Sequence, residues 1–201
     1  MFFYRNINNL KNIFILLFLI IFLKGCTNTD MKSFSNNTPN LDLFNFFNGE
    51  SIAYGIFEDR FGNLKRQFRV NLIGSIKDNK LILDEKFLYD DGESDTRIWT
   101  ITKDEFLKDQ TRYSGTAKDI EGKAKGTSSG NALNWSYDIY LNIQGKNLKV
   151  RFNDWIYQQD EHVAINRAYV SKFGIEIGSV TLVFLRGNAA KTIGRLNLDQ
   201  W

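Results

Sequence analysis

The sequence predicts an all-β protein: a single antiparallel up-and-down, lipocalin-like β-barrel of about 8–10 strands with a short N-terminal helix. Two observations support this fold class. Apolar and polar side chains alternate along most of residues 51–186, as they do on strands that bury one face. The same segment has no proline, and turn signals recur in it every 10–15 residues. About 140 residues are enough for one hydrophobic core, so we expect one domain.

The alternation assigns an inward face to each expected strand. The clearest strand is residues 133–143, where apolar side chains share one face and mostly polar ones share the other. The faces expected to point inward are, in chain order, Leu64, Arg66, Phe68, Val70 and Leu72; Leu81, Leu83, Glu85, Phe87 and Tyr89; Arg97, Trp99 and Ile101; Leu133, Trp135, Tyr137, Ile139, Leu141 and Ile143; Leu148, Val150, Phe152, Asp154 and Ile156; and Val163, Ile165, Arg167 and Tyr169.

The turns between these strands predict which side chains meet. Residues 90–92 read Asp-Asp-Gly, which is typical of a hairpin turn. A symmetric turn there would place Glu85 opposite Arg97. A tight hairpin after Tyr157 would place Asp154 opposite or diagonal to Arg167. Directly opposed side chains lie about 5 Å apart, so the pattern predicts two inward ion pairs.

A short apolar helix is expected at residues 41–47, before the first strand. Asn40 can cap its start, and Asn48-Gly49 can end it. Such a helix would plug one end of the barrel. The run at residues 175–185 is apolar on both faces and is expected to close the sheet.

The N-terminal segment has the pattern of an export signal. Arg5 and Lys11 precede the unbroken apolar run of residues 13–23, and Cys26 follows shortly after it. A bilayer core requires about 20 apolar residues, so this run is too short to cross it. Leu-Lys-Gly-Cys at residues 23–26 resembles the bacterial lipobox, which implies that the Cys26 sulfur is acylated and becomes the mature N-terminus.

A lone cysteine has other interpretations: a buried apolar residue, a reactive thiol or a partner in an intermolecular disulfide. None of them explains why Cys26 directly follows a small residue at the end of the apolar run. Lys24 departs from the small or apolar residue usual in a lipobox, and it could slow processing. Thr27 stands where an Asp commonly retains lipoproteins in the inner membrane. We therefore expect a lipid-anchored protein of the outer membrane that faces the periplasm.

The expected organisation is a signal peptide at 1–25, a flexible lipid-anchored tether at 26–40, the barrel domain at 41–187 and a C-terminal extension at 188–201. The chain has 26 Lys and Arg against 23 Asp and Glu. Three of the basic residues precede Cys26, so the remainder is formally neutral. A neutral body has no basic stripe for nucleic acid, and we expect no nucleic-acid partner.

Charged side chains recur on otherwise apolar faces of the expected strands. A buried charge needs a partner, or it costs several kcal/mol. One interpretation is a structural network of ion pairs and indole N–H groups. The other is an unpaired arginine that binds a ligand carboxylate or phosphate. The hypothetical ligand-binding residues inside the barrel are Arg66, Glu85, Arg97, Trp99, Trp135, Tyr137, Asp154 and Arg167.

Two neighbouring expected strands carry very little side-chain volume on one face. These small faces are Gly115, Ala117 and Asp119, and Gly122, Ala124, Gly126 and Ser128. They leave space in the interior, which either large residues such as Trp135 or Tyr137 fill or a small ligand occupies. Glycine also marks bends where a sheet curls, so packing alone could explain them.

No catalytic constellation is visible, so we expect a protein that is not an enzyme. The single histidine, His162, lies near a turn and is expected to be exposed. One His and no free Cys after lipidation leave no Ser-His-Asp or Cys-His arrangement. No His and Cys cluster suggests zinc. We expect no metal and no cofactor.

Several short motifs occur in a characteristic order. They are Phe46-Phe47-Asn48-Gly49, Asp84-Glu85-x-Phe87-x-Tyr89-x-Asp91-Gly92, Arg97-x-Trp99, Gly115-x-Ala117-x-Asp119, Gly130-Asn131-Ala132-x-x-Trp135, Asp154-Trp155 and Ser171-Lys172-Phe173-Gly174. In this order they resemble the family catalogued as domain of unknown function 3833 (DUF3833), lipoproteins of Gram-negative bacteria. The resemblance covers residues 41–186. It implies a lipobox, a single β-rich domain and no established activity.

Two functions are compatible with these features. The first is a binding module for a small hydrophobic or amphiphilic ligand, such as a fatty acid, with Arg66, Arg97 or Arg167 on its head group. The second is a structural or assembly lipoprotein that acts by protein contacts at the cell envelope. Its surface would be the aromatic pair Trp155 and Tyr157, which the alternation places outward. The sequence identifies no particular protein partner.

Overall fold

The computed structural model describes residues 29–143 and 146–201. All elements below lie in one compact unit, residues 31–201. The expected signal peptide and Cys26 lie outside the described residues. Among the described helices, none is long and apolar enough to cross a membrane.

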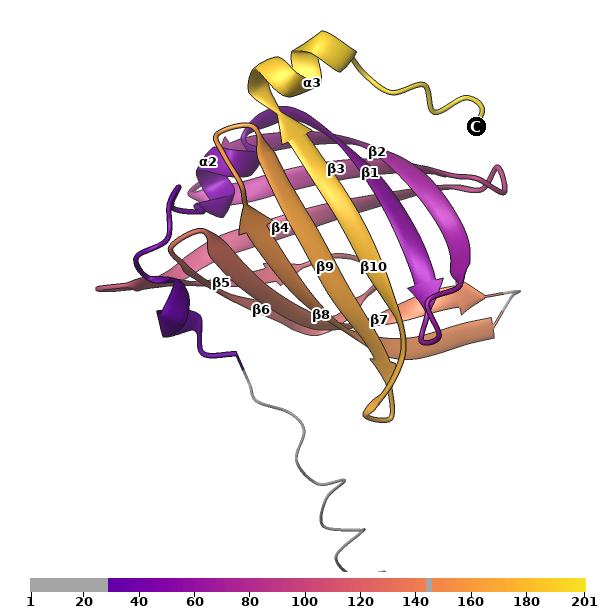
Figure 1. The fold of residues 1–201 in the computed structure, drawn as a ribbon, viewed down its shortest axis with the longest axis horizontal. Helices are drawn as coiled ribbons and strands as arrows, with labels where there is room; N and C mark the ends of the chain where they lie inside the picture. The colour runs from indigo at the N-terminus through magenta and orange to yellow at the C-terminus, as the bar shows by residue number, and fades with distance from the viewer. Residues whose placement is uncertain (1–28, 144–145) are drawn as a thin grey trace, which may run out of the picture. The chain divides into compact units, whose positions relative to one another are not determined.

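Ten antiparallel strands form a closed barrel in which each strand pairs with its sequence neighbours and β1 pairs with β10 (Figure 1). This confirms the predicted fold class. The strands are β1 (Gly49–Asp59), β2 (Leu64–Lys77), β3 (Lys80–Tyr89), β4 (Ser94–Leu107), β5 (Gln110–Thr116), β6 (Ile120–Ser129), β7 (Ala132–Ile143), β8 (Lys146–Gln158), β9 (Val163–Lys172) and β10 (Ile175–Arg186).

The short helix α2 (Leu43–Phe47) lies at one end of the barrel (Figure 1). Its N-cap is Asp42, whose Oδ1 accepts from the backbone N–H groups of Phe44 and Asn45 at 2.8 and 3.2 Å. The predicted cap Asn40 is therefore wrong by two residues. Four apolar side chains of the helix are buried, and the Phe47 ring meets Phe184 edge-on at 5.2 Å. The helix thus plugs this end of the barrel.

Glycine permits that plug to sit close to the wall. A Cβ on Gly74 of β2 would lie 1.7 Å from the backbone oxygen of Phe47. No side chain could be accommodated there, because the obstacle is backbone. The absence of a side chain at Gly74 thus allows the end of α2 to pack directly against β2.

The predicted register between β3 and β4 is confirmed. Glu85 is paired with Arg97, and Leu83 with Trp99. The Asp91-Gly92 turn fixes this register, because a hairpin turn of set length allows only one pairing.

The predicted inward face of β9 is wrong. Its buried residues are Ala164, Asn166, Ala168 and Val170, whereas Ile165 and Tyr169 are exposed. Asp154 is accordingly paired with Ala168, and Arg167 with Trp155. The barrel takes the narrow side chains of β9 inward and leaves the bulky ones outside.

Residues 31–40 pack on the outside of the barrel, although they were expected as part of the tether. The 3-10 helix η1 (Met31–Phe34) contacts β6 and β7. The Phe34 ring lies 6.0 Å from Trp155 and 5.9 Å from Tyr157, so it covers the expected aromatic patch. A Cβ on Gly130 would lie 1.8 Å from the backbone oxygen of Phe34, so this segment lies directly on the β6–β7 turn.

The C-terminal extension also packs on the barrel. It begins with α3 (Gly187–Ile193) and continues to the end of the chain. The side-chain amide of Asn71 donates to the backbone oxygen of Leu196 at 2.8 Å and accepts from its N–H at 2.9 Å. The Arg69 guanidinium lies 4.5 Å from the centre of the Trp201 ring. These contacts hold the extension against the outer face of β2.

Candidate functional site inside the barrel

The barrel brings five polar side chains from five places in the chain into one inward cluster. They are Glu85 on β3, Arg97 on β4, Asp119 in the β5–β6 turn, Tyr137 on β7 and Asp154 on β8. Arg97 donates from Nε and Nη2 to Oδ2 of Asp119, each at 2.9 Å. Asp119 is therefore the direct partner of Arg97, and Glu85 is its cross-strand neighbour.

Glu85 is held where its ionised form is disfavoured. Its side chain is 9% exposed, and burial raises its pKa to about 7. The charge of Arg97 and the Trp99 side chain oppose this rise, but they do not cancel it. Glu85 thus changes charge near neutral pH.

Asp154 is also a buried carboxyl group, and its hydrogen-bond partner is Asn166. It is 6% exposed, and burial raises its pKa to about 6. Asn166 on β9 opposes the rise by donating from Nδ2 to Asp154 Oδ1 at 2.8 Å. The predicted Asp154–Arg167 ion pair is absent from the described contacts, because the two side chains lie on opposite faces of the sheet.

Arg167 points away from the cluster. Its Nη1 donates to the Thr181 hydroxyl at 2.8 Å and lies 3.5 Å from a Glu58 carboxylate oxygen. Its side chain is 43% exposed. Arg167 is therefore an outer-face residue, and its predicted place inside the barrel is wrong.

Arg66 lies at the mouth of the barrel rather than among the deep residues. Its Nη2 lies 2.7 Å from Asp91 Oδ2 and 2.5 Å from Glu93 Oε2. Its guanidinium also sits 3.6 Å from the centre of the Tyr89 ring. Arg66 is thus neutralised by two acids of the β3–β4 turn and is not left unpaired.

Aromatic rings fill the wall beside the cluster. Trp99 meets Trp135 at 5.7 Å and Tyr137 at 5.3 Å, both edge-on. A Cβ on Gly115 would lie 2.8 Å from the Trp135 ring, and a Cβ on Gly126 would lie 2.3 Å from it. Trp135 therefore occupies the space that the small faces of β5 and β6 leave.

Carboxyl groups outnumber cations in the deep cluster. Glu85, Asp119 and Asp154 surround one guanidinium, that of Arg97. Asp119 Oδ1 and Asp154 Oδ2 are buried without a hydrogen-bond partner among the described residues. A buried acceptor without a partner costs about 1–3 kcal/mol. These two carboxylate oxygens therefore lack a donor among the described residues.

Solvent reaches some of the inward apolar residues near this cluster. Val180 and Leu182 on β10 alternate with Thr181, which binds outward-facing Arg167, so they face the lumen. Both pack against the core but remain partly exposed, as do Phe57 on β1 and Phe152 on β8. Their β9 neighbours across the sheet are small or short: Val180 pairs with Ala168, and Leu182 with Asn166. The inward side chains on the β9–β10 side are thus not fully covered.

The one histidine of the sequence lies away from the polar cluster. His162 lies in the β8–β9 turn, where its backbone oxygen accepts from the N–H of Arg186, and its Nδ1 faces Gly187. This is the end of the barrel where α3 begins, away from the Arg97–Asp119 pair. Within the described part of the chain, no three His, Cys, Asp or Glu side chains are grouped to hold a metal ion.

Sequence reasoning missed Asp119, a member of the cluster, and Asn166, the hydrogen-bond partner of Asp154. Asp119 shared a predicted face with Gly115 and Ala117, which was the available signal that it points inward. Asn166 was missed because it stands on the face of β9 that was taken as outer. Trp99, Trp135 and Tyr137 are buried, as predicted.

Comparison with solved structures finds a similar fold in the S-type phycobiliprotein lyase CPES from Guillardia theta. The TM-score is 0.50 at 7% identity, and the match covers 72% of this chain and 90% of that chain. At this identity the likeness shows the fold alone. No curated protein matches the chain. The model of the DUF3833 family, proteins of unknown function, matches residues 20–186, and the chain therefore belongs to that family.

Proposed function

We propose that this protein binds a small amphiphilic molecule inside its barrel, as a lipoprotein of the outer membrane. The observation that carries the binding proposal is the partial exposure of inward apolar residues beside a polar cluster with two unpartnered carboxylate oxygens. Val180 and Leu182 lie on a closed barrel wall and still meet solvent. A ligand that covers these apolar side chains is stabilised in the barrel by about 25 cal/mol per Å² of apolar surface buried.

The polar end of the ligand is a hydrogen-bond donor or a cation. Arg97 and Arg66, expected on a head group, already bind carboxylates of the protein. Asp119 and Asp154 each keep one buried oxygen without a partner. An anionic head group would add a further negative charge to this cluster, whereas a hydroxyl, amide or ammonium group would satisfy its free acceptors.

The ligand enters at the end of the barrel opposite α2. The β1–β2 and β9–β10 turns lie there, and their tips carry Phe61 and Phe173, which are 75% and 92% exposed. Arg66 and its acidic partners line the same end. Exposed apolar tips at an entrance suit a molecule delivered from a membrane or micelle.

The binding test uses three probes of equal chain length: dodecylamine, dodecanol and dodecanoate. Calorimetric titration of the detergent-solubilised full chain is expected to show tighter binding of the amine and the alcohol than of the carboxylate. Leu182→Trp, which fills the lumen, is expected to abolish binding, whereas Tyr54→Trp on the outer face serves as the matched control. Failure of all three probes, together with an empty barrel in native mass spectrometry of protein from its own envelope, would refute the proposal.

The envelope location is supported by the lipobox-like residues 23–26 and by Thr27. Cys26→Ser is expected to remove labelled acyl chains from the protein and to shift it from the membrane fraction to the soluble one. Retention of the label in this variant would exclude Cys26 as the acylation site. The separate assembly function depended on Trp155 and Tyr157 as free surface, and Phe34 packs on both. We therefore do not carry it forward.

A further inference from the structure

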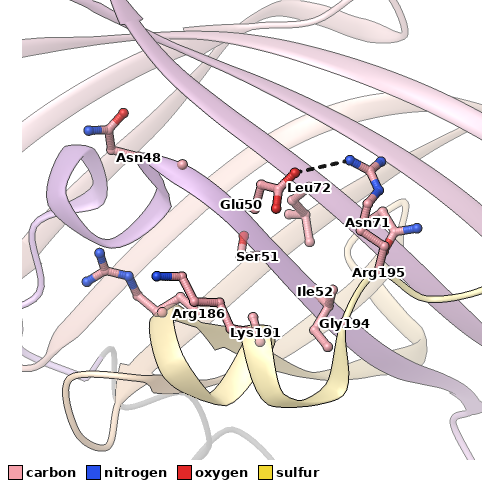
Figure 2. Close-up of a pocket in the computed structure, with 13 residues that line it drawn as sticks. Asn48, Glu50, Ser51, Ile52, Asn71, Leu72, Arg186, Lys191, Gly194 and Arg195 are labelled. Atoms are coloured by element: carbon pink, nitrogen blue, oxygen red, sulfur yellow. Dashed lines mark hydrogen bonds and ion pairs between the residues drawn. The ribbon is translucent and has the colours of Figure 1, made fainter.

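A pocket of about 490 Å³ lies where the C-terminal extension meets the start of β1 (Figure 2). It is outside the lumen cluster, at the end of the barrel where β10 passes into α3. We propose that this pocket binds a phosphate group, either on a small soluble molecule or on a lipid head group. The inference is independent of the proposed lumen ligand.

Positive charge dominates the pocket lining. Arg186, Lys191 and Arg195 line it, whereas Glu50 is the one carboxylate among its lining residues. Glu50 Oε1 lies 3.3 Å from Arg195 Nη1, so it offsets that cation in part. Arg186 and Lys191 have no ion pair among the described residues. The Arg186 guanidinium lies over the Phe46 ring, at 5.5 Å from its centre. Two cations thus remain available to an anion.

A buried hydroxyl provides a second, independent sign of a ligand. Ser51 lines the pocket, is 3% exposed, and its Oγ has no hydrogen-bond partner among the described residues. Ser51 is paired with Arg186 across β1 and β10, so both side chains project on the same face. A hydroxyl and a guanidinium can each donate a hydrogen bond to a phosphate oxygen.

The C-terminal extension completes the pocket. Lys191 and Arg195 both follow residue 186, where the family match ends. Gly194 ends α3 with a φ of 81°, and the chain then turns back to the Asn71–Leu196 clamp. Figure 2 shows Arg195 beside Glu50, and Lys191 projecting from α3 toward the start of β1. Lys191 and Arg195 thus line the same pocket as Ser51 and Arg186, which project from the inward strand face.

The test measures binding to the detergent-solubilised full chain. Inorganic phosphate and glycerol 3-phosphate are titrated calorimetrically, and vesicles of phosphatidylcholine with or without phosphatidic acid are tested by co-sedimentation. Binding of the soluble phosphates supports a small-molecule site. Binding of phosphatidic acid vesicles alone supports a lipid head group.

Variants separate a built site from general attraction. Arg186→Gln and Lys191→Gln are each expected to weaken binding about tenfold, as for loss of one charge-assisted hydrogen bond. Ser51→Ala is expected to weaken it less, with no loss of thermal stability, since its hydroxyl has no partner to lose. Lys123→Gln, an exposed lysine on β6, is the matched control. An equal effect of Lys123→Gln and Lys191→Gln, or no binding of any probe, would overturn the proposal.

Discussion

Trp135 and Gly126 are paired across β6 and β7 and share one volume inside the barrel. A Cβ on Gly126 would lie 2.3 Å from Cε3 of the indole. The other edge of the ring similarly meets Gly115, at 2.8 Å for Cζ2. Gly115 and Gly126 thus make room for the Trp135 ring, which fills this part of the lumen.

Gly126→Ala is expected to destabilise the protein by about 1–3 kcal/mol, because the added methyl group forces the indole from its position. Urea unfolding followed by circular dichroism measures the change. Trp135→Leu in the same chain should relieve the clash, so the two substitutions should be strongly non-additive. Additive effects of Gly126→Ala and Trp135→Leu would show that the indole does not pack against Gly126.

The stability of the protein is expected to fall as pH rises from 5 to 8, because the pKa values of two carboxyl groups, those of Glu85 and Asp154, are raised in the folded state. The folded state keeps the proton of Glu85 up to its pKa of about 7, whereas the unfolded chain releases it near 4.5. Asp154, with a folded pKa of about 6, acts in the same direction. Burial of both side chains is the cause, since it disfavours the ionised form.

Glu85→Gln removes one of these two contributions. Its free energy of unfolding, relative to the wild type, should rise by about 2 kcal/mol between pH 5 and pH 8, since one pKa unit corresponds to about 1.4 kcal/mol. Asp84→Asn, one residue away on the outer face, is the matched control and should change this difference little. An equal pH dependence in wild type and Glu85→Gln would contradict the burial of an ionisable Glu85.

The β3–β4 pairing could be predicted because two independent signals agree there. The Asp91-Gly92 turn sets the register, and one face alternates cleanly from Leu81 to Tyr89. On β9 these signals conflict, because both faces carry apolar residues. The choice between Ala168 and Tyr169 depends on how much room the opposite wall leaves. That room is a property of the closed barrel, which the residues of β9 alone do not specify.

The candidate site could be predicted in part for a related reason. The inward charges of Glu85, Arg97 and Asp154 follow from strand alternation. The partner of Arg97 does not, because Asp119 lies in a turn 22 residues away and meets it only when β4, β5 and β6 curl together. Strand pairing across a regular turn can be predicted from the sequence, and so can the ion pairs it brings together. An ion pair with a turn residue depends on the curvature of the barrel, which the sequence pattern does not specify.

Asn166→Ala is expected to cost about 1–3 kcal/mol of stability, because it leaves Asp154 Oδ1 buried without its donor. Arg167→Gln on the same strand should cost less than about 1 kcal/mol, since its ion pair with Glu58 is partly exposed. Chemical denaturation of both variants at pH 7.5 measures the difference. The opposite order of effects would favour an Asp154–Arg167 pair over the Asn166–Asp154 hydrogen bond.

If Cys26 carries the proposed lipid anchor, docking of Phe34 limits how far the barrel can move from it. Met31, the first residue of η1, lies five residues after Cys26, a separation that extended chain spans with at most about 18 Å at ~3.6 Å per residue. Release of residues 31–40 would lengthen that reach to roughly 50 Å. Phe34→Ala removes the ring that packs on Trp155 and Tyr157, and it is expected to release this segment.

Energy transfer measures this reach. A dye is attached through Lys86→Cys, at an exposed position on β3, and the acylated protein is placed in vesicles that contain an acceptor lipid. Phe34→Ala should lower the transfer efficiency, because the barrel then samples larger distances from the bilayer. Phe106→Ala, which removes a 70% exposed ring on β4, is the matched control and should leave the efficiency unchanged. Equal efficiencies in the Phe34→Ala and Phe106→Ala proteins would show that η1 does not limit the tether.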